Sequence, residues 1–300
     1  MQTSVSQKMR DFISFLLIIA LLCTGTGWAA GQTTDAASPA PADTSAAAAG
    51  AVDMSSARFA SLANDKKMTF SKKGTTIDYG NSSEGYIMVM QKAQKKAVKL
   101  QITKGKNKYL YDLNNKGNFE VFPLQFGDGK YQVQLYSQVS GNKYSPISNT
   151  TISVKLSDPN VSFLYPNQYA MYDQNSTTVA KSFELCQGLT TDQDKVDTVF
   201  NFISKNFKYD YVLAMKVQSG YLPDIDAKLA SLTGICFDYS AVMACMLRVQ
   251  GIPTQLAIGH ADTAYHAWNL VFLDGQWVRY DSTFASTGAT ANKYTVERFY

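Results

Sequence analysis

The sequence predicts an α+β protein with two folded parts, an N-terminal antiparallel β-sandwich and a C-terminal part in which helices pack on an antiparallel sheet. Three observations lead to this prediction. Short runs of strand-forming residues, broken by clusters of Gly, Asn, Asp and Ser, occupy residues 68–156. A long apolar run without Gly or Pro occupies residues 235–249. Two further runs flank Asp274-Gly275, a strong signal for a two-residue hairpin turn.

Length and composition are those of an ordinary globular protein. The 300 residues allow two modest domains plus tails, and 45% are hydrophobic and 17% charged. A formal net charge of +4 is mild and does not by itself indicate nucleic acid. Because no nucleic-acid-binding motif appears either, we expect no nucleic acid partner. The sequence leaves the oligomeric state open.

Residues 1–29 are predicted to be a signal peptide. Lys8 and Arg10 precede an apolar run, 12–23, which is short for a membrane span of about 20 residues. Cleavage after Ala29 would leave small residues at the two positions that processing requires. We therefore expect a secreted or cell-surface protein. An uncleaved anchor and a lipid attached at Cys23 are the alternatives.

Residues 30–60 are predicted to be a disordered linker, because residues 31–53 are mostly Ala, Thr, Pro, Ser and Gly and cannot form a core. Residues 65–157 follow as the β-sandwich, which we expect to be immunoglobulin-like. In this part residues 86–90 are continuously apolar and predict a fully buried strand, whereas 98–102 and 131–136 alternate and predict half-buried ones. The segment has no Cys or His, so we expect no catalytic group in it.

The sandwich segment is rich in lysine, with Lys92, Lys95, Lys96, Lys99, Lys104, Lys106 and Lys108 close together. Such a run is more often a solvated face of a β-domain than a site. The functional alternative is a patch that holds the protein near an anionic cell-wall polymer or a membrane surface.

Residues 158–300 are predicted to form the second domain. Thr191 is a candidate N-cap for a helix from residue 192 to about 206, with apolar residues at helical spacing. A polar loop, 216–226, then leads toward the apolar run at 235–249, which predicts a buried helix. Cys236 falls in the first turn of that helix. Unpaired N–H groups and the helix dipole favour an anion there, so they lower the pKa of a thiol.

The expected hairpin brings His266 and Asp281 onto one face. If Asp274-Gly275 is the loop, Leu273 pairs with Gln276, His266 lies opposite Thr283 and Trp268 lies opposite Asp281. His266 and Asp281 are then diagonal neighbours, roughly 7–8 Å apart at the backbone. A slip of one residue would place them on opposite faces.

Cys236, His266 and Asp281 supply the groups needed for nucleophilic acyl transfer. The imidazole accepts the thiol proton, the thiolate attacks, and the carboxylate orients the imidazole. A zinc site is not favoured, because Cys236, Cys245, His260 and His266 lack paired ligand spacing. We therefore expect no metal or organic cofactor. His260 is expected to be a surface loop residue rather than a second base.

Three cysteines remain after the predicted cleavage: Cys186, Cys236 and Cys245. An odd number in an exported protein indicates at least one free thiol. A Cys186–Cys245 disulfide is an alternative, but we favour three thiols because the folded part is large enough to be stable without disulfides.

Residues 192–283 resemble the transglutaminase-like superfamily of cysteine enzymes. The matching pieces are Gly234-Ile235-Cys236 at a helix start, Leu247 followed by Gly251-Ile252-Pro253, His266-Ala267-Trp268, and Asp274-Gly275-x-Trp277 followed by Asp281-Ser282-Thr283. The resemblance implies a papain-like core with Cys236 as nucleophile, His266 as base and Asp281 as the orienting acid. Ser282 departs from the family pattern, because many members carry Pro there. The resemblance assigns no oxyanion-hole side chain, so the backbone N–H of Cys236 is the default donor.

The sequence thus predicts an exported cysteine enzyme that hydrolyses a peptide or amide bond of a peptide or protein substrate through a thioester. Two alternatives remain. One is a protein cross-linking transglutaminase that transfers the acyl group of Gln to a Lys amine. The other is a non-catalytic module that binds cell wall or protein.

Overall fold

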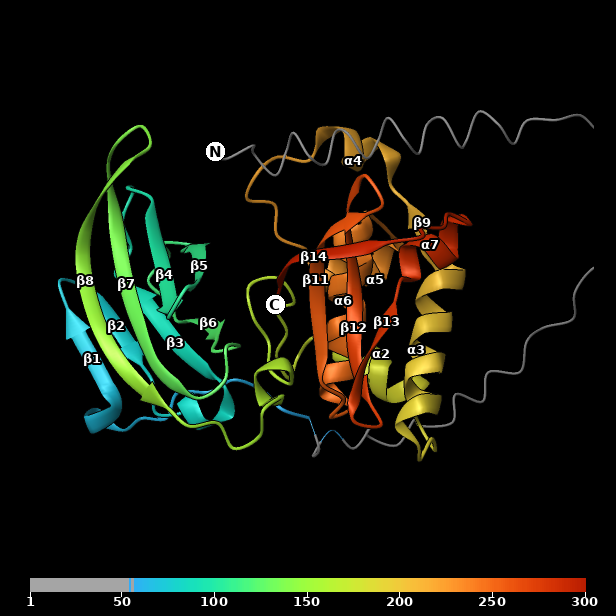
Figure 1. The fold of residues 1–300 in the computed structure, drawn as a ribbon, viewed down its shortest axis with the longest axis horizontal. Coiled ribbons are helices and arrows are strands. Elements are labelled where there is room, and N and C mark those ends of the chain that lie inside the picture. Colours follow the sequence, from blue (N-terminus) through green and yellow to red (C-terminus); the bar gives the residue numbers. More distant parts are fainter. Residues whose placement is uncertain (1–53, 55–56) are drawn as a thin grey trace, which may run out of the picture.

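The structure is a computed structural model that describes residue 54 and residues 57–300 (Figure 1). The predicted signal peptide, Cys23 and residues 31–53 lie outside the described residues. The end of the predicted linker belongs to the fold, because Phe59 packs against the C-terminal core and meets the ring of Tyr172 edge-on at 6.3 Å. Among the described residues, no helix is both long and apolar enough to span a bilayer.

The N-terminal part is built from two antiparallel four-stranded sheets, with orders β1-β2-β3-β6 and β5-β4-β7-β8. Their strands are β1 (Thr69–Lys72), β2 (Thr75–Asp78), β3 (Tyr86–Gln91), β4 (Val98–Lys104), β5 (Asn107–Asp112), β6 (Glu120–Pro123), β7 (Gly129–Ser140) and β8 (Lys143–Val154). Apolar side chains of both sheets form one core, including Ile77, Ile87, Val89, Leu100, Ile102, Val133 and Leu135. The immunoglobulin-like connectivity stays a prediction.

Strand β3 differs from its prediction. Its apolar run suggested burial on both faces, but Met88 and Met90 are only half-buried while Ile87 and Val89 are fully buried. Because β3 has one face on the core and the other toward solvent, it alternates like its neighbours. The apolar run alone could not show whether both faces of β3 are buried or whether its methionines lie on the face toward solvent.

The C-terminal part contains helices packed on the antiparallel sheet β13-β12-β11-β14. Its elements are α2 (Thr177–Leu185), α3 (Asp192–Asn206), β9 (Lys208–Tyr209), α4 (Tyr211–Lys216), α5 (Ile225–Ser231), β10 (Thr233–Gly234), α6 (Cys236–Val249), β11 (Thr254–Ala261), β12 (Ala264–Leu273), β13 (Gln276–Tyr280), α7 (Ser282–Thr287) and β14 (Tyr294–Phe299). The expected loop, 216–226, lies between α4, which ends at Lys216, and α5, which begins at Ile225. The sequence did not predict these two helices, because they are short and have no long apolar period.

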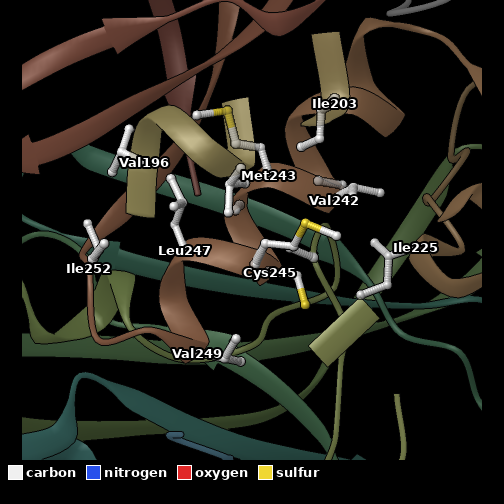
Figure 2. Close-up of a cluster of buried hydrophobic side chains, with 14 of the residues drawn as sticks. Val196, Ile203, Ile225, Val242, Met243, Cys245, Leu247, Val249 and Ile252 are labelled. Atoms are coloured by element: carbon white, nitrogen blue, oxygen red, sulfur yellow. The ribbon is translucent and has the colours of Figure 1, made fainter. Parts of the chain in front are cut away.

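Helix α6 is the centre of this part, as the sequence predicted. It lies between strands β11 and β12 on one side and helices α2, α3 and α5 on the other (Figure 1). All of its residues except Phe237 are buried. Figure 2 shows Val242, Met243 and Leu247 among the surrounding apolar side chains. Helix α3 is confirmed as well, because the Thr191 hydroxyl caps it by accepting a hydrogen bond from the Asp194 N–H at 3.1 Å.

The last residues of the chain connect the two parts. The buried guanidinium of Arg248, on α6, donates hydrogen bonds to the carbonyl oxygens of Thr254, Tyr165 and Tyr300 at 2.8–3.0 Å. The Phe299 carbonyl accepts hydrogen bonds from Tyr109 and Gln125 of the sandwich. These bonds fix β14 beside β11, and β14 carries a side chain that reaches the candidate site.

Candidate active site

Cys236 is the first residue of α6, and the residues before it are held tightly. Gly234 in β10 pairs with Tyr209 in the parallel strand β9. A Cβ added at Gly234 would lie 2.6 Å from the Cβ of Asp238, so the close approach of the chain to α6 requires glycine. The thiol is thereby placed at a helix N-terminus, where the dipole stabilises an anion.

A buried carboxylate fixes this helix start. Asp238 is fully buried, accepts a hydrogen bond from the Ile235 N–H at 2.8 Å, and accepts another from the Tyr221 hydroxyl at 2.5 Å. Lys228 lies 3.6 Å away. Burial raises the pKa of Asp238, and these three partners oppose the increase. Asp238 therefore ties the segment before Cys236 to the loop that carries Tyr221. The sequence analysis gave Asp238 no role.

The hairpin register is confirmed where the two strands pair. Leu273 pairs with Gln276 and Asn269 with Tyr280. Beyond that point the prediction was wrong: β13 ends at Tyr280, and Thr283, expected opposite His266, lies in α7. On the other edge of β12, His266 pairs with Gly259 of β11. The chain turns into α7 at Asp281 because the Asp281 carboxylate caps that helix, accepting the Phe284 N–H at 2.9 Å.

The turn still brings the imidazole and the carboxylate together. His266 Nε2 lies 2.8 Å from Asp281 Oδ2, and the buried imidazole stacks on Phe284 with a centroid distance of 4.4 Å. Burial lowers the pKa of His266. The charge and hydrogen bond of Asp281, together with a hydrogen bond and charge interaction with Cys236, outweigh burial and raise the pKa to about 9. The structure thus brings Cys236, His266 and Asp281 into one site.

Tyr294, which the sequence analysis missed, is a fourth member of this arrangement. Its hydroxyl donates a hydrogen bond to Asp281 Oδ2 at 2.8 Å, the same oxygen that faces His266. The ring is held in place by the Arg279 guanidinium 3.9 Å above it and by the edge of Trp268. Asp281 therefore has partners from β12, β14 and α7, which leaves its carboxylate a single orientation.

Two further tyrosines lie near the thiol. Burial raises the pKa of Tyr209 and of Tyr265, and the negative charge of the Cys236 thiolate adds to the increase in both. Tyr209 also packs against the two apolar clusters that contain Ile235 and Phe284, the residues at the starts of α6 and α7. The buried thiol therefore has two tyrosines in its surroundings.

The remaining predicted residues lie outside this site. Cys186 and Cys245 are free thiols, as expected, and burial raises the pKa of each, most strongly that of Cys245. His260 was expected in a surface loop, but it lies in β11 and its Nδ1 is 3.3 Å from Glu297. Strand β14 pairs with β11 beside His260, so this edge of β11 is not open to solvent.

The comparisons with known proteins agree with the resemblance. Residues 179–282 match the family model of the transglutaminase-like superfamily. This segment belongs to that superfamily. The match spans α2, the Cys236 helix, the hairpin and Asp281, so all three predicted triad residues lie within the transglutaminase-like segment. No protein with curated function matches the chain.

Three solved structures are similar to this chain. A protein proposed to be a cysteine protease, from Cytophaga hutchinsonii, is 14% identical over 66% of this chain and 78% of its own, with a TM-score of 0.37. The periplasmic domain of TgpA from Pseudomonas aeruginosa is 14% identical over 69% and 94%, with a TM-score of 0.34. A TGase is 17% identical over 53% and 47%, with a TM-score of 0.33. Scores this low support no conclusion about activity.

Tyr294 provides a test of how the transglutaminase-like site positions its imidazole. We expect Tyr294→Phe to lower kcat about fivefold with KM nearly unchanged, because one hydrogen bond that orients Asp281 is lost. We also expect the alkaline limb of the pH profile to move to higher pH, since Oδ2 then keeps more of its charge for His266. Tyr280→Phe is the matched control, because that hydroxyl faces Gln193 and not Asp281. Unchanged kcat and pH profile in Tyr294→Phe would show that Tyr294 is only a packing residue.

Proposed function

We propose that the protein is a cysteine hydrolase that cleaves a peptide or amide bond through a thioester on Cys236. The observation that supports this proposal most is the buried His266–Asp281 pair at 2.8 Å, which interacts with a cysteine at a helix N-terminus. Cysteine catalysis needs a thiolate, an imidazole that carries protons and a group that orients the imidazole. The same three groups occur here, and His266 interacts with Asp281 through Nε2 and also with Cys236, as the mechanism requires.

The first half-reaction forms the thioester. With Nε2 turned to Asp281, the other ring nitrogen of His266, Nδ1, accepts the proton of the Cys236 thiol. The thiolate attacks the substrate carbonyl, and the backbone N–H of Cys236 stabilises the resulting oxyanion. The tetrahedral intermediate collapses when the imidazolium gives its proton to the departing amine. The products of this step are a thioester on Cys236 and a free amine.

The second half-reaction releases the acyl group. His266 removes a proton from water, the hydroxide attacks the thioester, and the Cys236 thiolate leaves with the imidazolium restored. Hydrolysis needs only water as acceptor. A cross-linker would also have to hold a Lys amine beside the thioester and keep water out. We therefore place hydrolysis ahead of protein cross-linking, and both ahead of a non-catalytic binding module.

A Gln-containing peptide offered together with an excess of a primary amine separates these functions. We expect cleavage or deamidation of the peptide with little amine incorporated, measured by mass spectrometry of the products. Stoichiometric amine incorporation would instead identify a cross-linker that uses the same three residues. If no peptide or amide is turned over and Cys236 is inert to electrophiles, the non-catalytic module is the correct class.

We propose further that the enzyme acts outside the cytoplasm, on the basis of the N-terminal sequence alone. The charged residues, the short apolar run and the small residues before Ala30 are typical of a cleaved signal peptide. The mass of the exported protein should correspond to a chain that begins at Ala30. A mature N-terminus at a lipid-bearing Cys23 would contradict soluble export and leave the proposed chemistry unaffected.

A further inference from the structure

An open hollow lies at one end of the N-terminal β-sandwich, and lysines line it. It has a volume of about 690 Å³ and is formed by the β1–β2 turn, the β3–β4 loop and the β5–β6 loop. Its lining includes four exposed lysines: Lys72, Lys73, Lys92 and Lys116. No acidic side chain is among the described residues that line it. Figure 1 shows β1 and β2 on the side of the sandwich that faces away from the helices.

Hydrogen bonds hold the three loops together. The Lys92 N–H donates to the Gly74 carbonyl at 2.8 Å, which joins the β3–β4 loop to the β1–β2 turn. The Gln94 N–H donates to the Asn115 carbonyl, and the Asn115 amide donates to the Lys96 carbonyl, which joins it to the β5–β6 loop. The lysines are therefore carried on a connected frame rather than on three independent loops.

The positive charge in the hollow is not neutralised within the described part of the chain. None of its four lysines forms an ion pair with a described residue. Burial raises the pKa of Glu120, and the charge of Lys116 opposes this increase only in part. The Glu120 carboxylate is buried beneath the loop and accepts hydrogen bonds from the Asn114 N–H and the Gln168 amide. Four like charges around one concavity repel each other and attract a polyanion.

One lysine occupies a position that suits lysine poorly. Lys73 and Gly74 are the two central residues of the β1–β2 turn and have φ angles of +50° and +77°. Turns of this kind favour Asn-Gly, because Asn tolerates a positive φ better than a long side chain does. A lysine there costs turn stability and adds a charge to the hollow.

The structure also divides the lysine run at residues 92–108. Lys99 pairs with Asp112, and Lys104 donates to the Phe126 carbonyl. Lys106 and Lys108 lie beyond the far end of β4 from the hollow. At about 3.3 Å per strand residue, the length of β4 separates them from the hollow by roughly 20 Å. Of this run, Lys92 alone is among the described residues that line the hollow, where it joins Lys72, Lys73 and Lys116.

We propose that this hollow binds a linear polymer of phosphodiesters. All four charged side chains are lysines, which act as point charges toward phosphate, and none is an arginine, whose planar fork would fix one anionic group with two parallel hydrogen bonds. Four separate point charges instead suit a chain that carries one charge on each repeating unit. The lining has no aromatic ring on which a nucleobase could stack. None of the large exposed apolar side chains of the described part lies there to enter a membrane. This site does not depend on the proposed enzymatic function.

The test is binding of the full chain to an end-labelled poly(glycerol phosphate), measured by fluorescence anisotropy at about 0.1 M salt, near a 10 Å screening length. A variant without the lysines of the hollow, called the groove variant, combines Lys72→Gln, Lys73→Asn, Lys92→Gln and Lys116→Gln. The control combines Lys106→Gln, Lys108→Gln, Lys130→Gln and Lys143→Gln, which removes the same charge from the other sheet. We expect the groove variant to bind at least about tenfold more weakly and the control to stay within about twofold. Equal losses in the two variants, or no loss in the groove variant, would overturn the proposal.

Binding of two alternative ligands tests which class of polyanion the hollow prefers. Phosphatidylglycerol vesicles and single-stranded DNA with the same number of phosphates are offered to the wild type and the groove variant. We expect both to bind more weakly than poly(glycerol phosphate), with little dependence on the groove lysines. Equal or tighter groove-dependent binding of the vesicles or of the DNA would overturn the assignment to a polymer without lipid or bases.

Lys73→Asn alone separates binding from folding. Because Asn suits the positive φ, we expect the free energy of unfolding in urea to stay the same or to increase, while affinity for poly(glycerol phosphate) falls severalfold. A variant that keeps full affinity would show that Lys73 does not contact the polymer, and the hollow would lose its best-placed charge.

Discussion

Replacing Cys236 with alanine should lower kcat/KM by roughly 10⁴-fold or more, because the other two described thiols, Cys186 and Cys245, lie outside the site. Cys236→Ser should be nearly as inactive. A serine keeps the size of the side chain at the start of α6, but its hydroxyl is far less acidic than a thiol and is not activated by a helix terminus to the same degree. The measurement is steady-state cleavage of a peptide amide by purified variants, with circular dichroism to confirm that each is folded.

Cys186→Ala is the control for Cys236. Cys186 is as buried as Cys236, at 5% and 4% exposure, but it lies at the end of α2, outside the site. We expect its activity to stay within about twofold of the wild type. Substantial turnover by Cys236→Ala would show that the nucleophile has been misassigned, whatever the state of His266 and Asp281.

Asp281→Asn should have the second largest effect, a loss of roughly 10²-fold in kcat/KM at neutral pH together with a changed pH profile. Burial lowers the pKa of His266, but the charge and hydrogen bond of Asp281, together with the interaction with Cys236, outweigh burial and hold the pKa at about 9. The imidazolium that protonates the leaving amine therefore persists up to about pH 9, and activity falls as the pH rises through that value. Without the charge, burial dominates, so the pKa of His266 falls and the alkaline limb moves to lower pH by at least about one unit.

Asparagine is the suitable replacement at residue 281 because it is also a good helix N-cap, so the start of α7 should be kept. Asp274→Asn is the matched control. It makes the same chemical change in the exposed turn of the same hairpin, where a φ of +48° suits asparagine. An alkaline limb that does not move in Asp281→Asn would mean that Asp281 does not set the protonation of His266.

Local patterns predicted the parts of the site that local sequence determines. The Asp274-Gly275 turn set the register of β12 and β13, and the uninterrupted apolar run set α6 with Cys236 at its start. Both depend on residues that are adjacent in the chain or in one helix. The same reasoning extended β13 by three residues, to Thr283. The sequence Asp281-Ser282-Thr283 is as compatible with the end of a strand as with the start of a helix.

The contacts that come from distant segments could not be predicted in this way. Tyr294 reaches Asp281 because β14 pairs with β11 rather than with β13, its neighbour in sequence, and Arg248 stabilises that arrangement through the Tyr300 carbonyl. The bond between Tyr221 and Asp238 similarly joins a loop to a helix. A single sequence carries no signal for such pairings, since each requires the topology of the whole sheet.

The central claim is that Cys236 and His266 form a reactive thiolate–imidazolium pair, and iodoacetamide labelling followed by peptide mapping tests it most directly. At pH 7 we expect Cys236 to be alkylated at least about tenfold faster than Cys186 or Cys245, because burial raises the pKa of those two thiols. In His266→Ala, the rate at Cys236 should fall toward theirs, because the thiolate loses its counter-ion. Equal rates for the three thiols in the wild-type protein, or a Cys236 rate unaffected by His266→Ala, would contradict the account.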